Sequence, residues 1–242
     1  MNIYETRRLL DEYLLFHYGA AQEVLPWADG PQSALGFAVR TVTELADFSR
    51  PVETALDLGC AVGRSSFELA KHAASVLGMD YSHSFVEASA QLIRQDLPYQ
   101  RLDEAAATTP LVAQVPADCP RDRVRFEQGD AMHLRADLGS FDLVHAANLL
   151  CRLTDPALLI ARLPELVKPG GQLLLTTPCT WLEEFTPRGQ WPKGSTRDWL
   201  KRELAAHFDL AEEKDLPFLI REHARKYQWS VALGTRWIRK VA

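Results

Sequence analysis

The hydrophobic positions along the chain predict a regular succession of elements. Short apolar runs at residues 55–58, 74–79, 124–126, 141–146 and 172–177 have the length of buried strands. Helix signals lie between these runs, and the strongest is Thr154-Asp155-Pro156. Buried strands that alternate with helices are typical of a parallel sheet covered on both faces. The pattern therefore predicts an α/β fold with a mostly parallel sheet.

The two ends of the chain depart from this succession. Apolar residues from Leu9 to His17 recur at helical spacing, and a second helix is predicted from Ser33 to Ser49. Residues 1–50 are therefore expected to form an N-terminal helical cap over the ligand pocket. Residues 208–215 and 227–237 alternate in polarity, which predicts a C-terminal antiparallel strand pair.

Residues 98–122 interrupt the expected order of strands and helices. They are rich in Ala, Thr and Pro, and we interpret them as an insertion. A chain of 242 residues can bury one substantial core. Residues 1–242 are therefore expected to form a single domain that carries this insertion.

The turn from Asp57 to Gly63 carries the strongest chemical signal. An apolar strand runs through Asp57 into Gly59 and Gly63, and turn residues without side chains let backbone amides approach a ligand. Ser65 and Glu68 stand at capping-box spacing, which predicts a helix start behind the turn. The glycines do not follow the G-x-G-x-x-G order, so a dinucleotide is the weaker interpretation.

A carboxylate closes the next apolar run. Asp80 follows residues 74–79, at the end of a predicted strand, where ligands of open α/β sheets bind. A carboxylate in this position can accept both hydroxyls of a ribose. A nucleoside-type ligand is therefore expected at the glycine turn.

These segments resemble motif I and the neighbouring cofactor segments of Rossmann-like methyltransferases that use S-adenosylmethionine (SAM). Motif I is usually D-x-G-x-G-x-G, and here Ala61 replaces the middle glycine. The resemblance implies a Rossmann-like seven-stranded sheet, with SAM as the cofactor, S-adenosylhomocysteine as its product, and no metal. It also implies that Asp130 accepts a hydrogen bond from the exocyclic amine of the adenine. The implied cofactor-binding residues are Asp57, Gly59, Cys60, Ala61, Gly63, Asp80, Tyr81, Gly129, Asp130, Ala131 and Asn148.

Composition and charge narrow the class of partner. A net charge of -5 leaves no basic stripe for nucleic acid, so a small-molecule substrate is expected. No apolar run is long enough to cross a bilayer and residues 1–8 lack the apolar core of a signal peptide, so no membrane association and a cytoplasmic location are expected. The four cysteines show no C-x-x-C spacing, which argues against a zinc site or a disulfide framework.

Candidate substrate-binding residues lie in the loops that follow the predicted strands. In residues 181–185, two aromatic residues flank paired carboxylates, a composition suited to a cationic ring or an ammonium group; a solvated amphipathic turn is the alternative. Arg221, in a predicted loop over residues 217–223, can bind a carboxylate or simply pair with Glu222. His17 can supply a base or a hydrogen bond, or can pack as a structural residue.

Longer segments resemble the methyltransferase domain of ovothiol biosynthesis. They cover residues 4–6, 12–19, 57–68, 181–187 and 221–229. In that family the domain often follows an iron-dependent sulfoxide synthase and methylates a ring nitrogen of 5-thiohistidine, also called 4-mercaptohistidine, to give ovothiol A. We expect no such domain before Met1. The resemblance therefore implies a stand-alone N-methyltransferase whose 5-thiohistidine comes from a separate sulfoxide synthase and lyase pathway.

The loop positions suggest how such an acceptor would be held. Arg221 is expected to bind the carboxylate of the acceptor, and Glu183 or Glu184 its ammonium group. The candidate catalytic or ring-binding residues are Asn148, His17 and Tyr18. The candidate substrate-binding residues are Tyr18, Arg152, Trp181, Glu183, Glu184, Phe185 and Arg221.

Two other functions stay open at this point. The same scaffold serves other small-molecule N- or S-methyltransferases, because fold and cofactor site do not determine the substrate. A non-catalytic SAM-binding subunit of a partner enzyme is the alternative from another class. A monomer and a homodimer are both compatible with the sequence.

Overall fold

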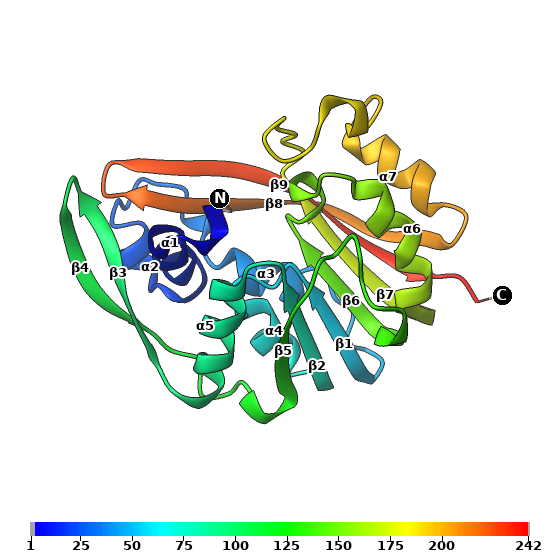
Figure 1. The fold of residues 1–242 in the computed structure, drawn as a ribbon, viewed down its shortest axis with the longest axis horizontal. Helices are drawn as coiled ribbons and strands as arrows, with labels where there is room; N and C mark the ends of the chain where they lie inside the picture. The colour runs from blue at the N-terminus through cyan, green and yellow to red at the C-terminus, as the bar shows by residue number, and fades with distance from the viewer. Residues whose placement is uncertain (1–2, 242) are drawn as a thin grey trace.

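The computed structural model describes residues 3–241, and Met1 and Asn2 of the segment discussed for a signal peptide lie outside that range. Within it, seven strands form one sheet in the order β5-β2-β1-β6-β7-β9-β8 (Figure 1). β9 runs antiparallel to both β7 and β8, and all other neighbouring strands are parallel. The strands are β1 (Val52–Leu58), β2 (Ala73–Asp80), β5 (Val124–Gln128), β6 (Phe141–Ala147), β7 (Val167–Thr177), β8 (Phe208–His223) and β9 (Lys226–Arg239). The predicted α/β fold with its C-terminal antiparallel pair is confirmed.

Helices cover both faces of the sheet, as predicted. Alternate strand residues such as Ala55 and Leu56 enter two separate apolar clusters, because successive side chains of a strand point to opposite faces. One cluster includes α1, α3, α4 and α5, and the other α6 and α7. The α-helices are α1 (Arg7–Tyr18), α2 (Ala21–Val24), α3 (Phe37–Thr43), α4 (Arg64–Leu69), α5 (His83–Arg94), α6 (Pro156–Leu166) and α7 (Thr196–Leu204). The 3₁₀ turns are η1 (Ile3–Glu5), η2 (Gln32–Ala34), η3 (Arg121–Arg123), η4 (Ala136–Leu138), η5 (Leu150–Arg152) and η6 (Arg188–Gln190).

Of the two helix starts predicted from capping residues, that of α6 is confirmed and that of α4 differs in its capping. The α6 helix begins as predicted, with the Asp155 side chain accepting a hydrogen bond from Ala157 N–H and Pro156 in the first turn. The capping box expected at the start of α4 is wrong. Gly63 occupies the cap position with a left-handed backbone, and the Ser65 hydroxyl donates instead to the carbonyl of Ala38 on α3. A tertiary partner thus replaces the local one.

The helix predicted from Ser33 to Ser49 is shorter than expected. Gly36 adopts a left-handed φ of 68°, which separates the single turn η2 from α3. The C-terminal end of α3 lies at Thr43, well before Ser49. A helical pattern in the sequence does not show where such a left-handed glycine interrupts it.

The segment interpreted as an insertion contains a separate two-stranded sheet. Strands β3 (Leu97–Glu104) and β4 (Ala107–Ala113) pair as an antiparallel hairpin beyond the seven-stranded sheet. The β3–β4 hairpin extends toward the tip of the β8–β9 hairpin, with α1 and α2 nearby (Figure 1). The insertion therefore supports the helical cap.

The C-terminal hairpin is longer than predicted. Residues 217–223, expected to form a loop, continue β8 and pair with residues 226–231 of β9. This distal part overhangs the sheet, because β7 ends at Thr177, opposite Leu233 of β9. The continuous pairing places alternate residues of the overhang on one face, and two of them, Phe218 and Ile220, line the main cavity. No helix within residues 3–241 is long and apolar enough to span a membrane.

Candidate functional site

The turn between β1 and α4, residues 59–63, lies at the carboxyl end of β1 and is called here the cofactor turn. Its backbone has positive φ angles at Gly59 (69°), Ala61 (48°) and Gly63 (81°). Positive φ is strained for a residue with a Cβ atom, so Ala61 persists there because its surroundings hold it. The Ala61 N–H donates to Asp80 Oδ2 at 2.8 Å, which provides one such restraint.

Asp80 links the cofactor turn to the start of α5. Its second carboxylate oxygen accepts the Ser82 N–H at 2.9 Å. Burial raises the pKa of the Asp80 carboxyl to about 6, and the nearby Asp57 adds to this rise, although hydrogen bonds from backbone donors partly oppose it. Each oxygen keeps a second lone pair that can accept a ligand hydroxyl.

Asp57 belongs to a buried network that sequence reasoning missed. His145 Nδ1 lies 2.7 Å from Asp57 Oδ1, and the Ser66 hydroxyl donates to Asp57 Oδ2 at 2.6 Å. The other ring nitrogen of His145 lies 3.0 Å from the Thr41 hydroxyl of α3. Asp57 and His145 are almost fully buried. The signal was a histidine within the apolar run 141–146, because a strand buried on both faces keeps a polar side chain only if it is paired.

Two predicted cofactor residues, Gly63 and Gly129, are not among the residues that line the cavity. A Cβ atom on Gly63 would lie 2.6 Å from the Phe126 ring, and one on Gly129 would lie 2.4 Å from the Met79 methyl group. Close packing therefore requires glycine at position 63, whereas the flexible end of Met79 can move away from a Cβ atom at position 129. The expectation that Gly63 and Gly129 contact the cofactor stays a prediction.

Asp130 and Asn148 are held at the ends of β5 and β6. Asp130 Oδ1 accepts the Met132 N–H at 2.8 Å, which orients its carboxylate beside Ala131. Asn148 has a φ of 53°, and its side-chain oxygen accepts the Thr176 hydroxyl at 3.0 Å. Both residues line the same cavity as Asp80. Residues from three strand ends thus converge, as expected for an open parallel sheet.

A single cavity of about 750 Å³ joins these strand ends to the helical cap and the hairpin overhang. Its size falls within the range of small-molecule and cofactor sites. Most of the predicted site residues line it. They are His17, Asp57, Gly59, Cys60, Ala61, Asp80, Tyr81, Asp130, Ala131, Asn148, Arg152, Glu184 and Phe185.

Aromatic side chains from distant segments form one wall of the cavity, which we call the aromatic bay. Tyr13 and Phe85 lie 4.9 Å apart between ring centroids, and Phe37 and Phe218 are equally close. The bay consists of Tyr4, Tyr13, Phe16, Phe37, Phe85 and Phe218. The sequence analysis missed most of these residues, because they belong to η1, α1, α3, α5 and β8 and only the fold brings them together.

Charged and polar groups stand at the edge of the aromatic bay. The Arg152 guanidinium lies over the Phe185 ring at 4.5 Å, and its Nη1 is buried without a hydrogen-bond partner among the described residues. Glu184 also faces the cavity. Burial lowers the pKa of His17 to about 3, more than the nearby Asp57 raises it, so its imidazole is neutral at physiological pH. His17 can therefore form hydrogen bonds there but carries no charge.

Three predicted acceptor residues lie outside the cavity lining. The Tyr18 hydroxyl donates to the Val62 carbonyl at 2.8 Å, so Tyr18 ties α1 to the cofactor turn. The Trp181 indole donates to the Thr196 hydroxyl at 2.9 Å and packs on α7. Glu183 is exposed and paired with Arg188. Leu182, Glu184 and Phe185 of the 181–185 motif therefore line the cavity, whereas Trp181 and Glu183 do not.

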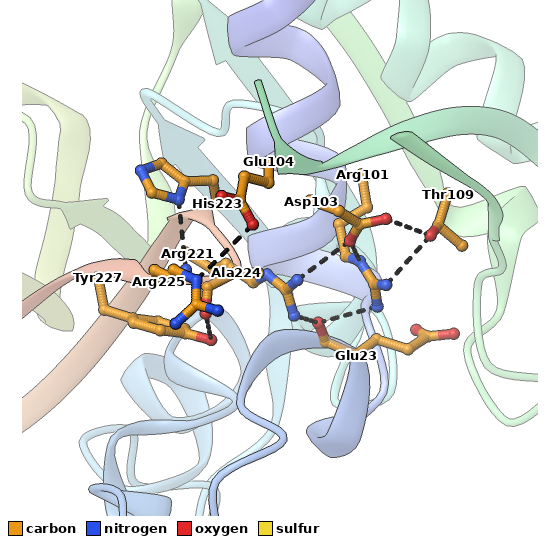
Figure 2. Close-up of polar contacts among 10 residues, drawn as sticks. All are labelled: Glu23, Arg101, Asp103, Glu104, Thr109, Arg221, His223, Ala224, Arg225 and Tyr227. Carbon is orange, nitrogen blue, oxygen red and sulfur yellow. Dashed lines mark hydrogen bonds and ion pairs between the residues drawn. The ribbon is translucent and has the colours of Figure 1, made fainter. Parts of the chain in front are cut away.

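Arg221 is also placed differently from the expectation. It is 4% exposed, and its guanidinium donates to the Glu23 carbonyl at 2.7 Å and to Asp103 at 3.2 Å. Figure 2 shows it directed toward α2 and the β3–β4 hairpin, where Arg101 contacts the same groups. Because Ile220 lines the cavity, its neighbour Arg221 must point to the opposite face of β8. The expectation that Arg221 binds a substrate carboxylate is therefore corrected.

Removing the Arg221 side chain is expected to reduce stability without changing ligand affinity. The Arg221→Ala variant removes one donor from the Glu23 carbonyl and one from Asp103, and it empties the buried space that the side chain fills, which costs about 2–3 kcal/mol of unfolding free energy. Urea unfolding would measure this loss. Arg225→Ala is the matched control, because Arg225 is exposed and its ion pair with Glu104 spans 3.7 Å. An Arg221→Ala protein of unchanged stability but weaker acceptor binding would contradict the placement.

Comparison with known proteins identifies similar sequences. Residues 32–224 match the family described as Methyltransferase domain. A trans-aconitate 2-methyltransferase of Deinococcus radiodurans is 34% identical over 131 residues, 53% of this chain and 39% of that protein. A ubiquinone biosynthesis O-methyltransferase of Coxiella burnetii is 30% identical over 122 residues, 50% of this chain and 42% of that protein. The chain thus spans less than half the length of these curated relatives.

Solved structures show the same fold at low sequence identity. The N-methyltransferase NodS of Bradyrhizobium japonicum WM9, in complex with S-adenosylhomocysteine, aligns with a TM-score of 0.55 at 14% identity. That alignment covers 95% of this chain and 98% of NodS. A putative methyltransferase of Bacillus halodurans C-125 aligns with a TM-score of 0.56, also at 14% identity, over 84% of this chain and 97% of that one.

Proposed function

Because the chain belongs to the methyltransferase-domain family, we propose that it transfers a methyl group from SAM to a ring nitrogen of 5-thiohistidine, giving ovothiol A. The observation that carries the proposal is one cavity that joins the cofactor turn and Asp80 to the aromatic bay. The choice of 5-thiohistidine among small-molecule acceptors rests on the sequence resemblance. The shape and charges of the acceptor end support it.

The residues at the strand ends fit SAM. Asp80 keeps lone pairs for ribose hydroxyls, and Gly59 provides a part of the turn without a side chain. Asp130 is oriented beside Ala131 at the cavity, in position for a polar edge such as that of adenine. Asp57 is already paired with His145 and Ser66, so we assign it chiefly to the support of the turn.

The acceptor end suits a flat ring that carries an amino-acid group. When bound, SAM supplies an electrophilic methyl group on a sulfonium, so the protein has mainly to align the acceptor nitrogen. Aromatic walls hold a flat ring and exclude water. In this proposal Arg152 binds the carboxylate, in place of Arg221, and Glu184 binds the ammonium group. His17 and Asn148 remain candidates for hydrogen bonds to the ring.

Incubation of the protein with SAM and 5-thiohistidine tests the proposal directly. Mass spectrometry is expected to show a singly methylated product, and nuclear magnetic resonance would identify the methylated nitrogen. Histidine, histamine and thiol acceptors serve as the comparison panel. Product from another acceptor, with none from 5-thiohistidine, would show a different small-molecule N- or S-methyltransferase. Binding of SAM without turnover of any acceptor would favour the non-catalytic subunit.

Arg152 is expected to determine affinity for the acceptor. Arg152→Met keeps much of the side-chain length but removes a charge-assisted pair worth about 3 kcal/mol, so KM for 5-thiohistidine should rise about 100-fold. Isothermal titration should show little change in SAM affinity. Arg188→Met provides the control, because Arg188 pairs with Glu183 away from the cavity. An unchanged KM in Arg152→Met would remove Arg152 from the acceptor site.

A further inference from the structure

The distal half of β9, residues 226–232, has an unpaired edge. Its other edge pairs with β8, from Lys226 opposite His223 to Ala232 opposite Leu216. The β7 strand, which pairs with β9 from Leu233 onward, does not extend this far. In Figure 1 the β8–β9 hairpin projects beyond the other strands of the sheet, and no strand is drawn along the outer edge of its β9 arm.

The backbone groups that face this open edge can be identified. The Pro217 carbonyl accepts a hydrogen bond from Arg40 at 2.9 Å, so it points away from β9 and its partner Val231 is not hydrogen-bonded to it. Hydrogen-bonded and non-bonded pairs alternate along an antiparallel ladder. Tyr227, Trp229 and Val231 therefore direct their N–H and C=O groups outward. No backbone or side-chain partner of these groups occurs among residues 3–241.

This edge lacks the features that normally prevent strand association. Residues 227–231 read Tyr-Gln-Trp-Ser-Val, without proline or charge and with high β propensity. Trp229 is 56% and Val231 39% exposed. On the same face, Trp27 is 55% exposed and borders an apolar groove together with Leu219, Tyr227 and Trp229. An exposed edge and an exposed apolar surface coincide, which is typical of an interaction site.

We propose that this edge pairs with the same edge of a second copy of the chain. An antiparallel pair related by a twofold axis through Trp229 places Tyr227 opposite Val231 and Gln228 opposite Ser230. The edge is therefore complementary to itself, with apolar residues on the outer face and uncharged polar residues on the cavity face. Unpaired backbone groups of both copies become satisfied, as they do when a strand adds to a sheet. Since Gln228 and Ser230 line the cavity, the pairing extends one of its walls across the dimer.

Analytical ultracentrifugation over a wide concentration range tests the dimer. The wild-type chain is expected to reach twice the monomer mass, and Val231→Lys, which puts a charge on the edge opposite Tyr227 and beside Lys226 of the other copy, is expected to stay monomeric. Val112→Lys is the matched control, because Val112 is 54% exposed on the separate β3–β4 hairpin and should leave the dimer intact. Circular dichroism and SAM titration would show that both variants fold. A wild-type chain that is monomeric throughout would overturn the proposal, as would a Val231→Lys chain that stays dimeric.

A cysteine at the proposed axis tests the register. In Trp229→Cys the two cysteines would lie directly opposite each other. The Cα–Cα separation of opposite residues in antiparallel strands is compatible with a disulfide. An added oxidant is expected to link the two copies rapidly, because the pairing holds the two thiols close together. The oxidant takes up the two electrons and two protons that are released as the S–S bond forms. The wild type, treated in parallel, reports linkage through the exposed Cys179. Linkage no faster than in the wild type would exclude pairing about Trp229.

Discussion

Replacement of Asp80 by asparagine is expected to weaken SAM binding about 100-fold, which corresponds to a loss of about 3 kcal/mol from charge-assisted hydrogen bonds. Both carboxylate oxygens already accept backbone N–H groups, from Ala61 and Ser82, and their remaining lone pairs are the expected acceptors of the ribose hydroxyls. An amide offers one oxygen in place of two. Isothermal titration would measure the affinity, and circular dichroism would show whether the fold is kept. Glu127→Gln is the control, because Glu127 pairs with Arg135 outside the cavity.

The same carboxyl predicts a pH dependence of SAM binding. Burial raises the pKa of Asp80 to about 6, so the carboxylate is present above that pH and is lost as the pH falls through it. Affinity for SAM should therefore be constant above pH 7 and should decline between pH 6 and pH 5. In Asp80→Asn this decline should disappear. A variant with wild-type affinity, or a decline that persists in it, would exclude Asp80 as the ribose acceptor.

The second large effect is expected at Gly63. The Gly63→Ala variant places a Cβ atom on a left-handed backbone, with φ of 81°, and within 2.6 Å of the Phe126 ring. The backbone contributes about 1 kcal/mol and the displaced ring about 2 kcal/mol, so the unfolding free energy should fall by about 3 kcal/mol. Urea unfolding would measure the loss. The physical cause is the close approach between the cofactor turn and β5.

A matched glycine separates these two contributions. Gly36 also has a left-handed φ, 68°, but an added Cβ would meet no atom within 4 Å. Gly36→Ala should therefore lose only the backbone term of about 1 kcal/mol. Phe126→Leu removes the ring that the added Cβ would meet. In that background, Gly63→Ala should therefore lower the unfolding free energy by less than it does in the wild type. Equal losses at Gly36 and Gly63 would show that the contact with Phe126 does not contribute.

The class of fold and the family were predictable from the sequence for local reasons. Continuous apolar runs are required in strands that are buried on both faces, so β1, β2, β6 and β7 are visible as patterns. A tight turn that admits a ligand needs small residues, and Asp57 to Gly63 satisfies that need within a few positions. The prediction of a SAM-dependent methyltransferase, made from this turn, is confirmed at the level of the family.

The acceptor end of the site could not be read in the same way. Arg221 and Ile220 are neighbours in sequence, yet the strand sends one to a buried ion pair and the other to the cavity. The sequence analysis treated residues 217–223 as a loop, and a loop has no such alternation. Trp181 and Phe185 diverge similarly, because Thr196 of α7 holds the first and the cavity receives the second. Each outcome depends on a partner far away in the chain.

The sequence by itself therefore determined the parallel sheet, the cofactor turn and the carboxylate of Asp80, because periodicity and turn chemistry act over a few residues. Only the tertiary structure decided which side chains share the cavity. It paired Asp57 with His145, gathered the aromatic bay from five elements, and left the distal edge of β9 open. Such contacts join residues far apart in the chain. A local sequence pattern therefore does not show which distant partner a side chain contacts.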